Sequence, residues 1–61
     1  MNDDPLLTVE EAAEYLGTGV RFVRRIVADR RITYVKVGKF VRLRQSVLEA
    51  FIAANTVERG S

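Results

Sequence analysis

The 61-residue sequence contains no cysteine and no histidine. Without cysteine, neither a disulfide bond nor a thiolate metal site can form. Without histidine, the chain lacks the usual general base and the commonest metal ligand, and triads of the Ser-His-Asp type are excluded. No pair of side chains with distinct acid and base roles can be picked out either, so we expect a protein that is not an enzyme and needs no cofactor.

Long apolar runs are also absent. The sequence has no signal-peptide pattern and no apolar stretch of about 18 residues, the length of a membrane span. We therefore expect a cytoplasmic protein without a membrane partner. The length suits one small domain over residues 1–61, with a folded core at about residues 6–54.

The net charge is only +2, but the charge is unevenly distributed. The segment Val20–Arg44 has a net charge of +8, because nine of its residues are basic and only Asp29 is acidic. The rest of the chain has a net charge of −6, with seven acidic residues against Arg59. Such a chain is expected to turn one face toward a polyanion, and a merely solvated basic surface is the alternative.

Within the basic segment, Val20–Arg31 has the pattern of an amphipathic helix at about 100° per residue. The apolar side is formed by Val20, Phe22, Val23, Ile26 and Val27. The opposite side is formed by Arg21, Arg24, Arg25 and Ala28. Arginine binds phosphate through two parallel hydrogen bonds and pairs with guanine edges. The stretch is therefore predicted to be a DNA recognition helix that begins near Val20 and ends around residues 29–31.

Residues 8–16 are predicted to form an earlier helix, in which Thr8 and Glu11 match a capping box. Its buried face would consist of Val9, Ala12, Ala13 and Leu16, with Tyr15 at the edge. The other face carries three glutamates, Glu10, Glu11 and Glu14. A metal site there is the weaker interpretation, because no other type of ligand is close in the sequence.

Two glycines separate the predicted helices, in the turn Gly17-Thr18-Gly19. Gly17 suits the left-handed position after a helix, and Gly19 can serve as the next N-cap. A lone Gly-x-Gly with no preceding strand favours a tight turn over a phosphate-binding loop. Helix, short glycine turn and helix together are typical of a helix-turn-helix.

The segment after the basic helix is predicted to form a hairpin with strands at residues 33–37 and 41–44. Alternation places four apolar side chains on one face, namely Val35, Val37, Val41 and Leu43. If all four face the core, Val37 must oppose Val41, which requires the three-residue loop Gly38-Lys39-Phe40.

This register would put Lys36 directly opposite Arg42 on the outer face, beside Lys39 at the tip. Like charges across a sheet are destabilising, so we interpret the hairpin as an anion-binding wing. An ordinary solvated hairpin is the alternative, because lysine also protects exposed strand edges.

The two ends of the chain are less patterned. Residues 1–7 are expected to be an acidic lead-in, with Leu6 or Leu7 packing as a hydrophobic staple. A last helix is predicted from Ser46 to about Ala54, opened by a second capping box between Ser46 and Glu49. Its core residues would be Val47, Leu48, Phe51 and Ile52. Residues 55–61 are expected to fray. The predicted fold is α+β, mostly α: a winged helix-turn-helix.

Three motifs carry a family resemblance. L-T-V-E-E-A-A-E-Y-L-G begins at Leu7, V-K-V-G-K-F-V-R-L-R begins at Val35, and S-V-L-E-A-F-I begins at Ser46. Together they resemble the excisionase family of small winged-helix proteins, which are related to the DNA-binding domain of MerR-type regulators. The resemblance extends over about residues 6–54, and the likeness is greatest to phage-encoded excisionases, with an actinobacterial phage as the expected source.

The resemblance implies a function and a set of contacts. Excisionases bind repeated DNA sites side by side, bend the DNA and help an integrase to excise a prophage, as recombination directionality factors. The partners it implies are double-stranded DNA, an integrase and adjacent protomers. The second helix would enter the major groove through Arg21, Arg24 and Arg25. The hairpin would reach the minor groove or backbone through Lys36, Lys39 and Arg42.

One local departure concerns the start of the second helix. Many relatives have serine at its N-cap and small polar residues early in the helix, where this chain has Gly19, Val20 and Phe22.

Two other functions fit the basic face: a small winged-helix transcription regulator, and a module that docks an acidic protein. Footprints at a promoter would favour the regulator, and binding to a purified acidic protein independently of DNA would favour the docking module.

Overall fold

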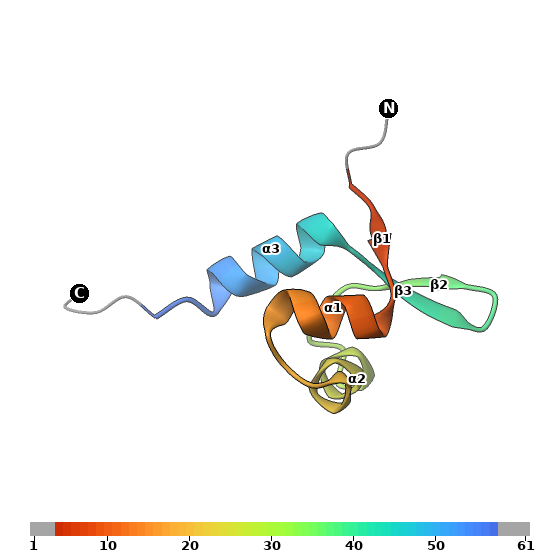
Figure 1. Ribbon diagram of the computed structural model, residues 1–61, viewed down its shortest axis with the longest axis horizontal. Coiled ribbons are helices and arrows are strands. Elements are labelled where there is room, and N and C mark those ends of the chain that lie inside the picture. Colours follow the sequence, from red (N-terminus) through yellow and green to blue (C-terminus); the bar gives the residue numbers. More distant parts are fainter. Residues whose placement is uncertain (1–3, 58–61) are drawn as a thin grey trace.

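The structure of the protein is a computed structural model that describes residues 4–57. This part of the chain contains three helices and one three-stranded antiparallel sheet (Figure 1). In chain order the elements are β1 (Leu6–Leu7), α1 (Val9–Leu16), α2 (Val20–Ala28), β2 (Val35–Val37), β3 (Phe40–Arg44) and α3 (Gln45–Ala54). The β2–β3 hairpin and α3 project in opposite directions from the α1–α2 pair (Figure 1). The predicted winged helix-turn-helix fold is confirmed.

α1 begins and ends with the local interactions that its sequence predicts. The N–H of Thr8 donates to Glu11 Oε1 (2.9 Å), and the N–H of Glu11 donates to Thr8 Oγ1 (3.0 Å), which completes the capping box. At the other end Gly17 has a φ of +73°, which glycine adopts without a steric penalty. Gly19 is the extended N-cap of α2, so a tight glycine turn joins the two helices.

α2 is anchored by Val23 and Ile26, whose exposed fractions are both 0%. They pack in the core with Ala12 and Ala13 of α1, whose small side chains permit close approach of the two helices. The prediction that Phe22 also faces the core is wrong, because this side chain is 39% exposed. α1 is the element packed most closely on α2, and it covers the Val23 and Ile26 side, which leaves Phe22 beside the arginines.

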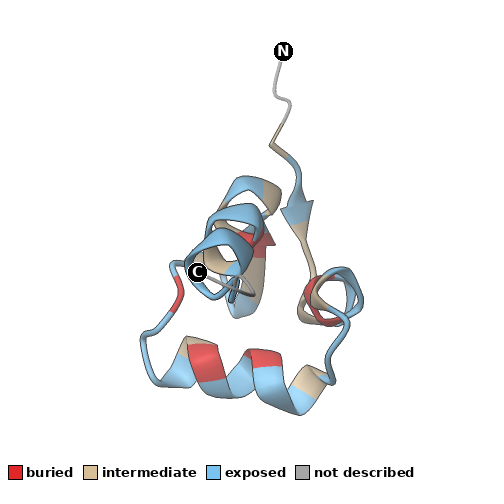
Figure 2. Cartoon of the chain, turned by 90° about the vertical axis from the view of Figure 1, so that its left-hand side faces the viewer, coloured by how far each residue is buried: buried red, intermediate tan, exposed pale blue. Residues whose placement is uncertain are grey.

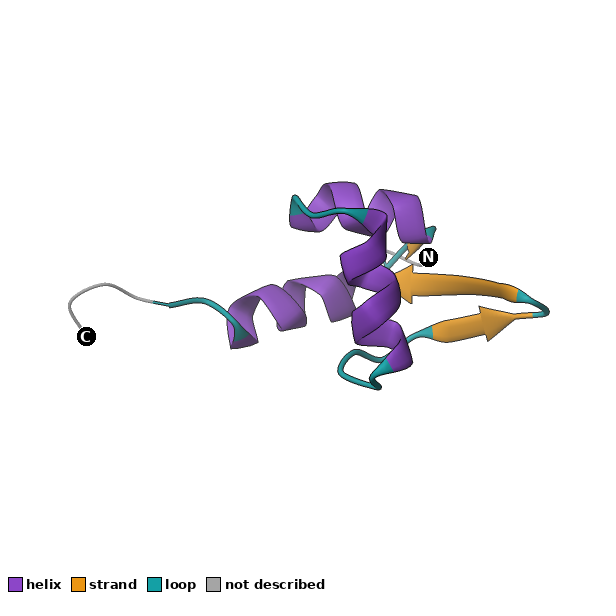
Figure 3. Ribbon diagram, turned by 90° about the horizontal axis from the view of Figure 1, so that it is seen from below, coloured by secondary structure: helices purple, strands orange, loops and turns teal. Residues whose placement is uncertain are grey.

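The β2–β3 hairpin differs from the predicted one by one residue in register. Val37 pairs with Phe40, so Gly38 and Lys39 form a two-residue turn instead of a three-residue loop. Gly38 has a φ of +62° and Lys39 does not have a positive φ, which is the pattern of a type II′ turn. The predicted loop assumed that Val37 is buried, but it is 51% exposed because the hairpin extends beyond the helices (Figure 3).

The observed register also separates two basic side chains that were predicted to face each other. Lys36 pairs with Val41 and shares a face with the buried Leu43, on the side of the sheet toward the helices. Arg42 pairs with Val35 on the other face. The predicted like-charge pair of Lys36 and Arg42 is therefore wrong.

The N-terminal segment is a structural element and not a simple lead-in. Leu6 and Leu7 pair with Arg44 and Leu43, which gives the sheet order β1-β3-β2. The N–H of Gln45 donates to the carbonyl oxygen of Pro5 at 3.1 Å. This strand fixes the chain on the edge of β3 that β2 leaves free.

Asp4 caps α3 from outside the helix. The Asp4 carboxylate accepts hydrogen bonds from the N–H (2.8 Å) and the Oγ (2.7 Å) of Ser46. These bonds hold the pKa of Asp4 below its usual value. Arg44, whose Nη1 lies 4.0 Å from Asp4 Oδ2, lowers this pKa further. The predicted Ser46–Glu49 capping box is wrong, because α3 begins at Gln45 and Glu49 instead accepts a hydrogen bond from Tyr15.

The core is small and lies where the three helices meet β3 (Figure 2). Its buried members are Ala12, Ala13, Val23, Ile26, Ile32, Leu43 and Leu48. From α3, Leu48 is buried and Val47 and Phe51 pack against the core, but the prediction for Ile52 is wrong, since it is 42% exposed. Asn55 ends α3 and residues 55–57 are exposed; the rest of the predicted frayed tail lies outside the described residues. No helix within residues 4–57 is long and apolar enough to cross a membrane.

Candidate nucleic-acid interface

The exposed side of α2 is a row of arginines around one aromatic ring. Arg21, Arg24 and Arg25 are all exposed, and together with Phe22 they line a shallow hollow. None of the three arginines forms an ion pair within residues 4–57. Their guanidinium groups can therefore bind an anion without first leaving an internal partner, and they do so from a helix whose buried side is fixed in the core.

The wing, defined here as residues 35–44, carries its charge around an exposed ring. Lys39 Nζ lies 5.9 Å and Arg42 Cζ lies 5.3 Å from the centroid of the Phe40 ring. Arg42 Nη1 also donates to the carbonyl oxygen of Val41 at 2.9 Å, so part of its hydrogen-bonding capacity is used inside the wing. Lys39 sits in the turn at the tip of the wing and is exposed.

A groove separates α2 from the wing. Its lining residues are Val9, Glu10, Arg24, Val27, Ala28, Lys39, Phe40, Val41 and Arg42. The groove brings together three of the six residues predicted to bind DNA: Arg24, Lys39 and Arg42. In the view from below, α2 crosses the molecule and the hairpin extends to one side of it, so both can approach one elongated ligand (Figure 3).

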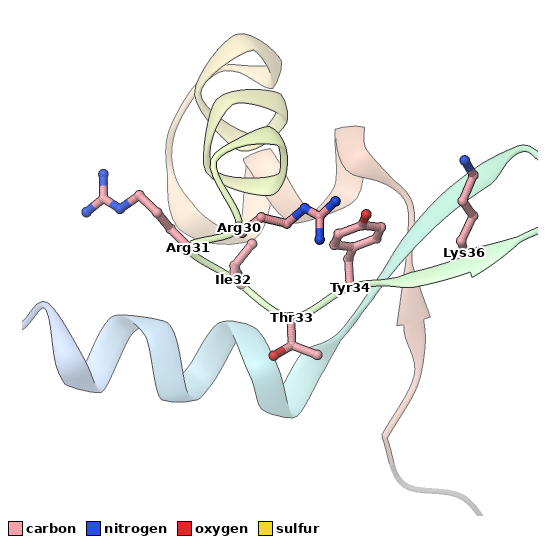
Figure 4. Close-up of a pocket in the computed structure, with 6 residues that line it drawn as sticks. All are labelled: Arg30, Arg31, Ile32, Thr33, Tyr34 and Lys36. Atoms are coloured by element: carbon pink, nitrogen blue, oxygen red, sulfur yellow. The ribbon is translucent and has the colours of Figure 1, made fainter.

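Lys36 does not join that groove. It lines a separate hollow at the C-terminal end of α2 (Figure 4). The residues around this hollow are Arg30, Arg31, Ile32, Thr33, Tyr34 and Lys36. Arg21 and Arg25 also lie outside the groove, on the exposed side of α2. The predicted binding residues thus form three adjoining groups, and not a single pocket.

Sequence reasoning missed several residues of this surface. Phe22 was assigned to the core, and Phe40 was assigned to a loop without a role. The sequence pattern assigns Arg30 no role beyond its charge and places Tyr34 in a predicted strand. The one sequence signal that could have found Phe22 is its place between Arg21 and Arg24 at the edge of the apolar side.

Nothing in the described part of the chain resembles a metal centre. Within residues 4–57, no group of three or more acidic, histidine or cysteine side chains is placed to hold an ion. Of the three glutamates of α1, Glu11 accepts a hydrogen bond from the N–H of Thr8 and Glu10 lines the groove beside Arg24. The chemistry that this surface offers is the binding of a polyanion.

A short helix pair joined by a tight glycine turn, an arginine-bearing second helix and a basic wing define a DNA-binding domain of the helix-turn-helix class. A family model described as "Helix-turn-helix domain" matches residues 6–56, and the chain belongs to this family. No match was found among curated proteins or among solved structures. The family includes excisionase-like small DNA-binding proteins, its members are typically not enzymes, and membership implies sequence-specific binding of double-stranded DNA.

Proposed function

We propose that this protein is an excisionase. It binds repeated sites in an attachment region, bends the DNA and helps an integrase to excise a prophage in the cytoplasm of a bacterial host, where it is associated with the nucleoid. The structural observation that supports DNA binding most strongly is the groove between α2 and the wing, into which both elements direct cations. The recombination role is supported by the three sequence motifs that resemble phage excisionases.

In this proposal, α2 enters the major groove of the DNA. Arg21 and Arg25 contact base edges, with guanine as the preferred partner, and Phe22 contacts the methyl group of a thymine. Arg24 lines the groove of the protein between α2 and the wing, and it contacts the phosphate backbone beside the bases.

The wing then meets the adjoining minor groove or backbone. Lys39 at its tip supplies a phosphate contact, Phe40 packs on the edge of a sugar, and Arg42 lies close to the Phe40 ring and supports both. Each phosphate contact releases about one counterion, so the affinity falls steeply with salt concentration.

Bending requires more than one protein molecule. Bending a site of about 20–30 base pairs costs on the order of 1–6 kcal/mol. One domain with about six basic contacts has little affinity to spare for this, so adjacent protomers on repeated sites, or an integrase, offset the cost.

The test is footprinting of the purified protein on an attachment region, with and without integrase, combined with an assay of excision in vitro. We expect protection of neighbouring repeats, slower migration of DNA fragments that are centrally bent, and excision that depends on the protein. Specific protection of promoter DNA, with no effect on excision, would contradict the recombination role and identify a transcription regulator instead.

A further inference from the structure

α2 ends in a conformation that its sequence does not favour. The N–H of Arg31 donates to the carbonyl oxygen of Ile26 (2.9 Å), and the N–H of Arg30 donates to that of Val27 (3.1 Å). This is the Schellman pattern, in which the residue after the cap is left-handed and usually glycine. Here that residue is Arg30, with a φ of +58°, the one positive φ among the non-glycine residues that the structure describes.

The strained position directs the side chain into a cationic hollow. Figure 4 shows Arg30 pointing toward Tyr34, while Lys36 rises from β2 on the side where α2 lies. The lining of the hollow contains no acidic residue, and neither Arg30 nor Lys36 forms an ion pair within residues 4–57. Arg31, the next residue, also borders this hollow, but its side chain points away from Tyr34 and Lys36 (Figure 4).

We propose that Arg30, Lys36 and the hydroxyl group of Tyr34 bind one phosphate group of the DNA backbone, beside the stretch that α2 reads. Two cations and a hydroxyl donor, without a carboxylate among them, match the chemistry of a phosphodiester and not that of a base edge. The positive φ of Arg30, a position that favours glycine, supports a functional role for its side chain. The inference rests on the proposed DNA binding and extends the group of contacts around Lys36.

The decisive variants remove the side chain without adding backbone strain. Arg30→Gly and Arg30→Asn both suit a left-handed residue, so each should unfold at or above the midpoint temperature of the wild type. On the specific site, each should bind several-fold more weakly than the wild type. The slope of log affinity against log salt should become shallower by no more than about 0.9, the value for one lost phosphate contact, because Lys36 still faces that phosphate.

The matched control is Arg31→Ala, which removes the same charge from the neighbouring position. Phosphate-ethylation interference should lose one position with both Arg30 variants and keep that position with Arg31→Ala. If the wild type binds its site and the Arg30 variants match it in affinity and salt slope, the phosphate contact is wrong while the proposed DNA binding stands. If the wild type itself shows no specific binding, the proposed function fails, and the contact fails with it.

Discussion

α2 and the wing are both basic, but they present their charge in different ways. The arginines of α2 stand on a helix whose other side is anchored by the fully buried Val23 and Ile26. The wing extends beyond the core, with Val37 and Phe40 about half exposed, and its Arg42 is already bonded to the wing backbone. A rigid support fixes the angle of each guanidinium group, whereas a projecting hairpin fixes mainly the place of the charge.

This difference separates selectivity from affinity. Hydrogen bonds to base edges require fixed geometry, so we assign site selection to α2. Contacts with phosphate tolerate more movement, so we assign general affinity to the wing. The predictions below test this division, from the largest expected effect to the smallest.

The largest effect is expected for Arg21→Ala and Arg25→Ala. Each should lower the preference for the specific site over scrambled DNA by about 1–3 kcal/mol, because a good bidentate contact with a base is lost. Competition binding at constant salt measures this preference. Equal weakening on both DNAs would assign these arginines to the backbone and remove the basis for calling α2 the selective element.

A smaller loss of selectivity, on the order of 1 kcal/mol, is expected for Phe22→Ala, through the lost contact with a thymine methyl group. The unfolding temperature should change little, because Phe22 is exposed. Replacing that thymine by uracil should weaken the wild type and leave the variant unaffected. Phe40→Ala is the control on the wing and should still bind the uracil-containing site more weakly than the thymine-containing site; insensitivity of Phe40→Ala to uracil would contradict the division.

Lys39→Ala should weaken binding to all DNA sequences by a similar factor. Because one phosphate contact is lost, the slope of log affinity against log salt should become shallower by about 0.9. Titrations on specific and scrambled DNA at several salt concentrations measure both quantities. A change confined to the specific DNA would show that the wing selects sequence as well.

The smallest effect concerns Asp4, which holds the start of α3 next to the base of the wing. Because its pKa is lowered in the folded protein, its ionised form contributes stability above the unfolded value of about 3.8, and this contribution is lost as the pH falls through the lower folded pKa. Asp4→Asn should therefore unfold at a lower temperature than the wild type at pH 6. The difference should shrink on acidification toward and below pH 4, and a constant difference would contradict the cap.

The elements predicted correctly are those specified by neighbouring residues. The capping box of Thr8 and Glu11, the left-handed Gly17 and the limits of α2 all depend on side chains within a few positions of one another.

The elements missed depend on distant parts of the chain. Two leucines reveal a strand only when β3 is already beside them, and Asp4 caps a helix that starts some forty positions later. The predicted register of the wing is wrong because it places Val37 in the core, whereas this side chain is exposed where the hairpin extends beyond the helices. Arg30 was not predicted as a binding residue because arginine does not favour a positive φ and because its hollow forms only when β2 lies beside the end of α2.

The central claim is that α2 binds the major groove of the DNA while the wing meets the adjoining minor groove. Hydroxyl-radical footprinting of the wild type and Lys39→Ala on one repeat tests this claim most directly. We expect the wild type to protect the backbone on both sides of a major groove and also across the adjoining minor groove, about half a helical turn away on the same face. Lys39→Ala should lose the minor-groove protection and keep the rest. Protection of a single groove by the wild type, or its complete loss with Lys39→Ala, would contradict the account.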